Sequence, residues 1–421
     1  MMKDLAIVGS GIAGLTVGYL AKKSGYSIKI YESSGRVGGR IFTTKNGSIL
    51  TDLGAEFIAT YHTSILKICQ DLNISLTRNS CTTEFALPEL ILFESIFLSD
   101  NKIRELELEF LVVIDELISI AQRIDPQNPL TSFSKDYDKQ SIFEWLKTKK
   151  TSRELQNFFT DLDPRKHSML GLLSLVSGSG GKNLFTESET FSITGGSDIL
   201  IKSLMDFLKD DIVFETEVVG ITTSKKGCEM RNRTSFGLIN IESFNAVVIA
   251  IPSESIKKID INGLDLSNLT YPLMSHNWTM SIVFDEMIQV NDKYILTDQS
   301  NRIIYTKPNT STPSEVKVHI CPHLSNHEFD VVESTLKVCN IPKTLSIKVA
   351  EVKWHENNWA GGSYSYYPVN YFQSEQKIQS LKIPGIFFAG DYLVPGFAGF
   401  MEGGIRSSEM VFETIKRTIF H

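Results

Sequence analysis

The order of apolar and polar positions predicts a strand, a helix and a second strand at the start of the chain. Residues 4–8 are mostly apolar, residues 12–23 have helical periodicity, and residues 27–31 alternate as a strand does. This order is typical of a βαβ unit, in which the two strands are parallel neighbours in one sheet. The chain therefore begins as an α/β protein.

Apolar residues recur at alternating steps of three and four positions further along, which predicts a helix of about six turns. The repeat consists of Ile103, Leu106, Phe110, Val113, Leu117, Ile120 and Ile124. Such a seam forms either a coiled-coil surface for a partner or a contact within the protein. Further apolar residues at Leu108, Leu111 and Val112 favour a helix packed on two sides within the protein.

The remaining periodicities indicate that two structural units are interleaved along the chain. A second helical stretch covers residues 141–159, and strands are predicted at 212–214 and 218–221. The apolar run 246–251 fits a fully buried parallel strand, and α/β character returns at 386–415. The unit that begins at the N-terminus is therefore expected to be completed by segments from the middle and the end of the chain.

Composition excludes some classes of partner. The chain has 421 residues, 49 acidic against 42 basic side chains and a net charge of -7, and no basic stripe alternates with aromatic residues, so we expect no nucleic-acid partner. No apolar run reaches the roughly 18 residues that a membrane span needs. The apolar run 85–98 is interrupted by Pro88, Glu89 and Glu94, which favours one or two buried strands over membrane contact.

Cysteine and histidine usage predicts neither disulfides nor a metal. Five widely spaced cysteines without a CxxC pair are typical of reduced thiols, and we expect a cytoplasmic protein. His319, Cys321, His323 and His327 are metal-ligand types within a short stretch. The alternation around them fits a strand with alternate buried residues, so no metal site is predicted.

A glycine-rich turn directly after the first strand has the pattern of a dinucleotide-binding site. It reads Gly9, Ser10, Gly11, Ile12, Ala13 and Gly14. The first glycine permits a tight turn, the second allows a pyrophosphate to approach the backbone, and the third lets helix and strand pack closely. Glu32, 18 residues beyond Gly14, is placed to accept hydrogen bonds from ribose hydroxyls, with Ser33 beside it. NAD and FAD share this pattern.

Several further segments discriminate between the two cofactors. They are residues 35–40 with Arg36, Gly38, Gly39 and Arg40; residues 52–57 with Gly54, Ala55, Glu56 and Phe57; residues 194–197; Glu217 with Val218; residues 250–252; residues 354–364; and residues 388–391 and 397–403. Together they resemble the flavin-containing amine oxidase superfamily, which includes monoamine oxidases, polyamine oxidases and renalase-like enzymes. The resemblance covers most of the chain. Residues 84–190 resemble the family only in the general character of their sequence and not residue for residue.

The resemblance implies an α/β fold in which a Rossmann-type FAD-binding domain is interleaved with an α+β substrate-binding domain. The FAD-binding domain is expected at 1–80, 190–252 and 368–421, and the substrate-binding domain, with a helical insertion, at 81–189 and 253–367. The cofactor contacts implied include the glycine turn, Glu32, Ser33, the 35–40 and 52–57 segments and the backbone of Val218 at the adenine. Arg40 is suited to pair with phosphate oxygens.

The C-terminal segments imply the reacting end of the site. By resemblance Trp354 lies near the flavin, Asp391 meets the ribityl-phosphate region at a helix N-terminus, and Gly390, Gly399 and Met401 contact the cofactor. Tyr364 and Phe400 are implied to face each other in front of the flavin ring. Two such rings form an apolar slot that orients a substrate and stabilises positive charge by cation-π attraction, whereas ordinary aromatic core packing is the alternative.

Two departures from the family pattern bear on the chemistry. Ser363 stands where monoamine oxidases carry the cysteine that links the flavin, so FAD is expected to be non-covalent. The strand 278–284 carries Met280 where many members carry a lysine that contacts flavin N5 through water. Because of that difference, the sequence does not determine whether the protein activates water at the flavin, reacts with O2 or oxidises amines.

The first functional hypothesis is an FAD-dependent oxidase of a small amine, with hydride transfer to flavin N5 and O2 as oxidant. A desaturase or renalase-like oxidase of a cyclic substrate is the alternative within enzymes. Outside the enzymes, a further possibility is a non-catalytic protein that binds flavin and uses the 103–124 seam to bind a partner. The substrate and the oligomeric state are not determined by the sequence.

Overall fold

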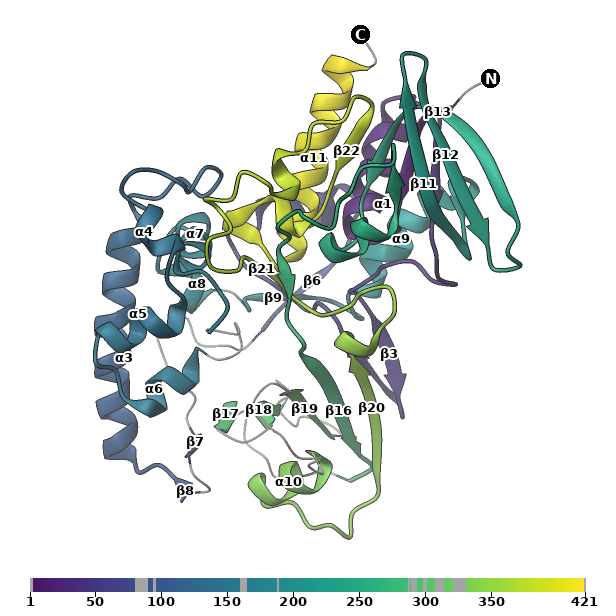
Figure 1. Ribbon diagram of the computed structural model, residues 1–421. Coiled ribbons are helices and arrows are strands. Elements are labelled where there is room, and N and C mark those ends of the chain that lie inside the picture. The colour runs from purple at the N-terminus through teal and green to yellow at the C-terminus, as the bar shows by residue number, and fades with distance from the viewer. Residues whose placement is uncertain are drawn as a thin grey trace.

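The computed structural model describes residues 3–79, 90–93, 96–159, 165–187, 189–286, 288, 294–297, 301–306, 314–320 and 331–419. Figure 1 shows a helical region at the left, a sheet region at the bottom, and an upper part in which segments from both ends of the chain lie with strands from its middle.

An eight-stranded sheet joins the two ends of the chain with its middle. The strands run in the order β10-β2-β1-β13-β12-β11-β14, and β22 pairs with β13. They are β1 (Lys3–Val8), β2 (Ile28–Tyr31), β10 (Ile212–Val213), β11 (Thr216–Ser224), β12 (Gly227–Thr234), β13 (Ile239–Ile249), β14 (Asp260–Ile261) and β22 (Ile386–Phe388). β1 is parallel to both β2 and β13, and β13 is parallel to β22. The predicted interleaving of chain segments is therefore seen in this sheet, while the domain limits stay a prediction.

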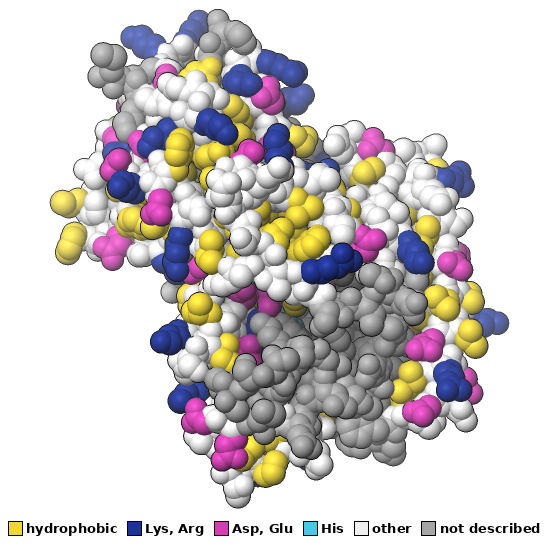
Figure 2. All heavy atoms as spheres, turned by 180° about the vertical axis from the view of Figure 1, so that it is seen from behind, with side chains coloured by type: hydrophobic (Ala, Val, Ile, Leu, Met, Phe, Trp, Pro, Cys, Tyr) yellow, Lys and Arg dark blue, Asp and Glu magenta, His cyan; other side chains and the backbone are white. Residues whose placement is uncertain are grey.

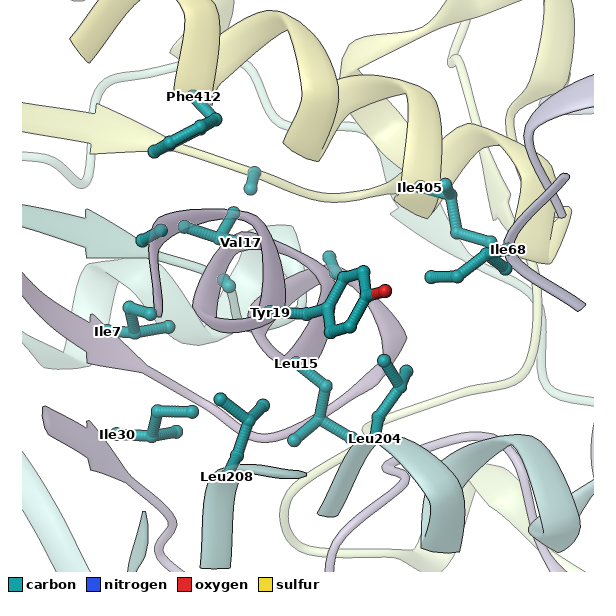
Figure 3. Packing of buried hydrophobic residues seen from close by; sticks show 14 of the residues in the cluster. Ile7, Leu15, Val17, Tyr19, Ile30, Ile68, Leu204, Leu208, Ile405 and Phe412 are labelled. Carbon is teal, nitrogen blue, oxygen red and sulfur yellow. The ribbon is translucent and has the colours of Figure 1, made fainter. Parts of the chain in front are cut away.

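Both faces of the parallel strands are buried, which explains their continuous apolar runs. On one face Leu5 and Ile7 pack with residues of α1 (Ile12–Lys23), α9 (Asp198–Leu208) and α11 (Met401–Thr418), and Figure 3 shows side chains from these helices in that core. On the other face Ala6 and Val8 pack against the antiparallel strands β11 to β13. The open ends of the parallel strands are thereby left free to line a site.

A second sheet has the order β20-β16-β19-β18-β17-β7-β8. Its strands are β7 (Leu90–Phe93), β8 (Ile96–Phe97), β16 (Trp278–Phe284), β17 (Tyr294–Thr297), β18 (Asn301–Thr306), β19 (Ser314–Ile320) and β20 (Ile347–Lys353), with α10 (Val331–Val338) against one face. The strand predicted at 278–284 matches β16. β7 and β8 confirm strands within the run 85–98, of which residues 85–89, 94 and 95 lie outside the described part.

The predicted seam helix is α3 (Asp100–Ala121), and its seam packs within the protein. Leu106, Phe110, Val113 and Leu117 are buried in one cluster with residues of the neighbouring helices. The expected packing on a second side is wrong, because Leu108 and Val112 are 67% and 69% exposed. The intramolecular seam argues against its use as a coiled-coil surface.

The second predicted helix, 141–159, is divided by a turn at Lys150, whose φ is +55°. The helices around it are α4 (Lys135–Asp138), α5 (Ile142–Thr148), α6 (Arg153–Phe158), α7 (Met169–Gly178) and α8 (Asn183–Thr186). Ser141 and Glu144 form a capping box that starts α5. Short connecting elements complete the fold: α2 (Thr63–Asp71), β3 (Thr43–Asn46), β4 (Ile49–Asp52), β5 (Phe57–Ile58), β6 (Leu76–Arg78), β9 (Phe191–Ile193), β15 (Leu273–Met274) and β21 (Ser365–Tyr366).

Acidic and basic side chains are interspersed on the face shown in Figure 2, without a basic stripe. Among the described residues, none of the helices has the length and apolarity to cross a membrane. Within the same described residues no cluster of three or more metal-ligand side chains occurs, and Cys321, His323 and His327 lie outside them.

Candidate cofactor and substrate site

One elongated cavity lies at the ends of the parallel strands and extends to the second sheet. Its lining comes from within residues 8–13, 32–41, 54–55, 217–218, 250–259, 277–279, 354–364 and 390–404. The N-terminal turns of both α1 and α11 contribute to it, through Ile12 and Met401. Helix N-termini carry unpaired N–H groups and a partial positive charge, which suits a phosphate-bearing ligand.

Two glycines of the glycine turn, Gly9 and Gly14, leave no room for a side chain. Gly9 has a φ of +98°, and a Cβ there would lie 2.7 Å from the carbonyl oxygen of Ala250. A Cβ on Gly14 would lie 1.9 Å from the Gly9 carbonyl oxygen, so Gly14 allows α1 to pack on the turn. Gly9 to Ala13 line the cavity, whereas Gly14 does not. The role of Gly14 is to let α1 pack closely on the turn, as the sequence pattern predicted.

Glu32 lines the cavity and also holds two loops in place. Its Oε2 accepts hydrogen bonds from the Ser10 backbone N–H at 3.0 Å and from the Ser10 hydroxyl at 2.6 Å. Its Oε1 accepts one from the Ser34 N–H at 2.9 Å. The carboxylate at the end of β2 thus fixes the glycine turn relative to the segment that contains Ser33 and Arg36, both of which line the cavity.

Arg40 and Asp391, which the sequence assigned separately, form an ion pair. Arg40 Nη2 lies 2.5 Å from Asp391 Oδ1, and Arg40 Nη1 donates to the Ser363 carbonyl oxygen at 2.9 Å. Asp391 Oδ2 also accepts from the Gly399 N–H at 3.0 Å. Burial raises the pKa of the Asp391 carboxyl, but the neighbouring Arg40 guanidinium outweighs that effect and holds the pKa below its usual value. This pair ties together three lining segments, 32–41, 354–364 and 390–404.

The aromatic residues predicted at the reacting end line the same cavity. Trp354 is buried and donates from Nε1 to the Leu53 carbonyl oxygen at 3.0 Å. Gly399, with a φ of +82°, brings its backbone so close that a Cβ there would lie 3.4 Å from Tyr364 Cβ. Phe400 follows Gly399, so the segments that carry Tyr364 and Phe400 are adjacent. Tyr364 is 43% exposed and is accessible from solvent.

His62 supports the ring of Phe400 and was missed by sequence reasoning. The two ring centroids are 5.0 Å apart. His62 Nδ1 accepts a hydrogen bond from the Ala59 N–H at 3.1 Å, so the neutral ring carries its proton on Nε2. Burial and the charge of Arg406 lower the His62 pKa to about 3. No motif marks this residue, because its contact with Phe400 joins positions far apart in the chain.

Ser363 occupies the predicted position, and neighbouring groups already engage its hydroxyl. Ser363 Oγ lies 2.8 Å from Ser275 Oγ, and the Ser363 N–H donates to the Ser275 carbonyl oxygen at 2.9 Å. The Tyr364 N–H donates to Ser275 Oγ at 3.1 Å. This network orients the backbone on either side of Ser363 and lines the cavity with a hydroxyl.

Strand β16 presents different residues to the cavity from those that the family pattern suggested. Met280 is buried in the apolar cluster on the face of the sheet that packs against α10. Asn277 and Thr279 lie on the opposite face and line the cavity. Asn277 is 5% exposed, and its Oδ1 has no hydrogen-bond partner among the described residues. Because side chains alternate between the two faces of a strand, the sequence could have indicated that Asn277 and Thr279 share a face opposite to Met280.

Two other predicted cofactor residues, Glu56 and Phe57, do not line the cavity. Gly54 and Ala55 do, and the next side chain points away from them. Glu56 Oε2 instead lies 2.5 Å from Nζ of Lys317 on β19. Phe57 starts β5 and pairs with Ser192 on β9. The remaining predicted residues, from Glu32 to Met401, are brought together along the one cavity.

This lining fits FAD. The glycine turn leaves a backbone cradle, two helix N-termini supply donors for phosphates, and Val218, Pro252 and Tyr364 all contribute to the lining. The unpartnered Asn277 oxygen gives the ring end a buried acceptor. An extended ligand with charged phosphates and a planar ring matches this set of groups.

Comparisons with known proteins agree with this geometry. A family model described as flavin containing amine oxidoreductase matches residues 12–276 and 305–411. The flavin-containing amine oxidase A of Sus scrofa is 23% identical, over 97% of this chain and 84% of the relative. The probable flavin-containing monoamine oxidase A of Dictyostelium discoideum is 22% identical, over 98% of this chain and 97% of the relative.

Solved structures share the fold. Cyclohexylamine oxidase from Brevibacterium oxydans superposes with a TM-score of 0.85 at 19% identity, over 100% of both chains. Wild-type putrescine oxidase bound to putrescine superposes with a TM-score of 0.82 at 15% identity, over 99% of both chains. The predicted fold class, an α/β flavin-binding unit interleaved with a second unit, is confirmed over the full length.

Proposed function

The chain belongs to the flavin-containing amine oxidoreductases, and we propose that it is an FAD-dependent oxidase of a small amine. The observation that carries the proposal is that one cavity is lined both by the dinucleotide cradle of the glycine turn and by Tyr364 and Phe400. The names of the similar enzymes, which refer to monoamines, cyclohexylamine and putrescine, support amines as the substrate class.

When bound, FAD would supply the redox chemistry: it would accept a hydride from the carbon that bears the neutral amine, and O2 would then reoxidise it and be reduced to hydrogen peroxide. The protein then has to orient the amine and exclude competing reactions. Tyr364 and Phe400 are expected to flank the substrate, and their ring faces favour the positive charge that develops on it. The imine product leaves for hydrolysis by water.

We propose that FAD is held without a covalent bond. Ser363 cannot form the thioether that a cysteine forms, and its hydroxyl is engaged by Ser275. The charge-assisted contacts of the cavity, with Arg40 as the cation and Glu32 as the ribose acceptor, are then the main source of affinity.

The cofactor proposal is tested by denaturation of the yellow protein with acid. Free FAD should appear in the supernatant in a ratio near one to each polypeptide, identified by its absorbance and mass. Flavin that stays with the precipitated chain would contradict non-covalent binding, and a colourless protein that takes up no FAD would contradict the cofactor itself.

The substrate proposal is tested by anaerobic mixing of the FAD-loaded protein with a panel of amines. The panel contains a primary arylalkylamine, a cyclohexylamine, a secondary amine and a diamine. At least one of them should bleach the flavin absorbance, because the reductive step needs no O2. Anaerobic mixing separates this step from oxygen reactivity.

A second candidate, a renalase-like oxidase or desaturase of a cyclic substrate, is favoured by one observation. Asn277, directly before β16, and Thr279 in β16 present neutral side chains to the cavity instead of a lysine. A dihydro-heterocycle is therefore included in the panel. If that compound bleaches the flavin and every amine fails, the amine proposal is wrong and the second candidate takes its place.

A further inference from the structure

A buried ion pair connects the second sheet to the cofactor segment, and no step of the proposed function uses it. Lys317 on β19 is 1% exposed, Glu56 is 7% exposed, and Lys317 Nζ lies 2.5 Å from Glu56 Oε2. Buried ion pairs contribute little net stability, because desolvation of the two charges offsets their attraction. Stability alone is therefore a weak explanation for this pair.

Strand register places Lys317 on the face of the sheet that lines the cavity. Thr279, a lining residue, pairs with His319, and Ser281 pairs with Lys317. Directly paired residues, and residues two apart on one strand, share a face. Lys317 therefore lies on the same face as Thr279 and Asn277, and Met280 lies on the other.

The partner of Lys317 directly follows two residues that line the cavity. Glu56 follows Gly54 and Ala55, which line the cavity. Trp354, another lining residue, donates from Nε1 to the carbonyl oxygen of Leu53 in the same segment. The pair thus joins the segment that carries Gly54, Ala55 and the Trp354 acceptor to the face of the second sheet that lines the cavity.

Two further buried carboxyl groups, those of Asp52 and Glu315, lie near Lys317. Asp52 is buried and accepts from the Ser197 N–H at 3.0 Å, and burial raises its pKa, with the charge of Glu56 adding to the rise and Lys317 opposing it. Glu315 is buried and accepts from the Ser281 hydroxyl at 2.6 Å. Charges in a poorly solvated region act over longer distances than charges in water, so each of these groups contributes to the potential in the cavity.

We propose that Lys317 and Glu56 act as an opposed pair of charges that sets the reduction potential of the bound flavin. This inference rests on the proposed function, because it requires FAD in the cavity. Reduction adds negative charge to the ring, so the Lys317 cation favours the reduced flavin and the Glu56 carboxylate opposes it. Neither residue is expected to touch the substrate, and both act on the flavin through space.

The test measures the reduction potential of the FAD-loaded protein by equilibration with a reference dye, for Lys317→Met, Glu56→Gln and the double variant. In Lys317→Met the ratio of reduced to oxidised flavin at fixed potential should fall at least tenfold, which is about 30 mV for a two-electron couple. In Glu56→Gln the ratio should rise by a similar factor. In the double variant it should return to within about threefold of the wild type, because both charges are gone.

The opposite signs separate this role from a structural one. A structural role predicts shifts of the same sign, or none, in both single variants, and either result overturns the inference. Lys348→Met is the matched control, because Lys348 on β20 of the same sheet pairs with Asp285 at 2.9 Å while both side chains are about half exposed. That variant should leave the potential unchanged, and a shift as large as that of Lys317→Met would also overturn the inference.

Two further measurements keep the outcome interpretable. Thermal unfolding shows whether each variant folds. If one single variant does not fold, the other single variant should still shift the reduction potential in its expected direction from the wild type, and the double variant should return it. A shift of the wrong sign, or no shift, then overturns the inference. If FAD binds and an amine reduces it, but the reduction potentials of the Lys317 and Glu56 variants equal that of the wild type, this inference alone is wrong. Failure of the wild type to take up FAD contradicts the proposed function together with it.

Discussion

At the residue scale, the direction of each side chain decides its role. Ala55 lines the cavity while Glu56 pairs with Lys317, and Thr279 lines it while Met280 is buried in the core of the sheet. A shift of one position along an extended segment turns a side chain to the opposite face. A motif match therefore identifies the segment but does not identify which of its side chains faces the ligand.

The aromatic residues give a prediction at this scale. Tyr364→Ala or Phe400→Ala should leave FAD bound and lower kcat/KM for flavin reduction about tenfold, because each change removes orientation and cation-π stabilisation worth about 1 to 2 kcal/mol. Tyr364→Phe should cost much less, because the ring face is retained. Stopped-flow reduction under anaerobic conditions measures the effect. A Tyr364→Phe variant as slow as Tyr364→Ala would assign the role to the hydroxyl instead.

His62 gives a pH prediction. Its pKa is lowered by burial and by Arg406 to about 3 in the folded state, below its ordinary value of 6.5, so between these values the unfolded chain binds the extra proton. The contribution of His62 to stability is complete above about pH 6.5 and falls by up to about 1.4 kcal/mol for each pH unit below that.

The measurement is the free energy of unfolding in urea between pH 4.5 and 7. His62→Gln should flatten this pH dependence, whereas His276→Gln, a change at an exposed histidine, should retain it. Equal pH dependence in the wild type and His62→Gln would show that His62 is not held neutral by the fold.

At the element scale, helix ends position the site. α11 starts at the cavity, and Glu402 in its first turn is buried. The Glu402 carboxylate accepts from the N–H groups of Ser64 at 3.0 Å and Ile65 at 2.9 Å, in the first turn of α2, and Arg406 Nε lies 2.5 Å from it. One side chain therefore caps α2 and fixes it beside α11, with His62 and Phe400 at the junction.

Removal of this cap should destabilise the protein. Glu402→Ala leaves two helix N–H groups and Arg406 without their acceptor, which costs about 2 kcal/mol or more of the free energy of unfolding. Glu413→Ala, on an exposed turn of the same helix, is the control and should change stability by less than about 0.5 kcal/mol. Urea unfolding compares them, and equal stabilities would show that the cap is redundant.

At the scale of the whole molecule, the cavity joins segments that are far apart in sequence. The turn at Gly9, the segment at Ala55, β16, Tyr364 and the start of α11 all contribute to it. A ligand that binds such a cavity contacts each of these segments when the protein is folded and loses them together on unfolding. Ligand binding and global stability are therefore coupled.

This coupling predicts that FAD raises the melting temperature in proportion to the logarithm of its concentration. At 100 times the dissociation constant, the gain is about 2.7 kcal/mol. Glu32→Ala should weaken FAD binding by about 1.5 to 3 kcal/mol and reduce the rise accordingly. Glu229→Ala, an exposed change on β12, should not. A melting temperature that is independent of FAD would contradict the placement of the cofactor.

The sequence by itself determined the elements that depend on local pattern. Periodicity located the βαβ unit, the strand 278–284 and the long helix, and the glycines at 9, 11 and 14 predicted the turn, because steric limits on backbone and Cβ are local properties. Motif spacing also indicated which segments belong to the family, including Trp354, Tyr364 and Phe400.

Only the tertiary structure decided which groups meet. The Arg40 pair with Asp391, the Lys317 pair with Glu56 and the contact of His62 with Phe400 join positions separated by hundreds of residues, and no local pattern encodes such distances. The exposure of Leu108 and Val112 likewise depends on whether another element covers them. Burial and ion pairing are properties of packed surfaces, so the chain specifies them only through the fold that brings those surfaces together.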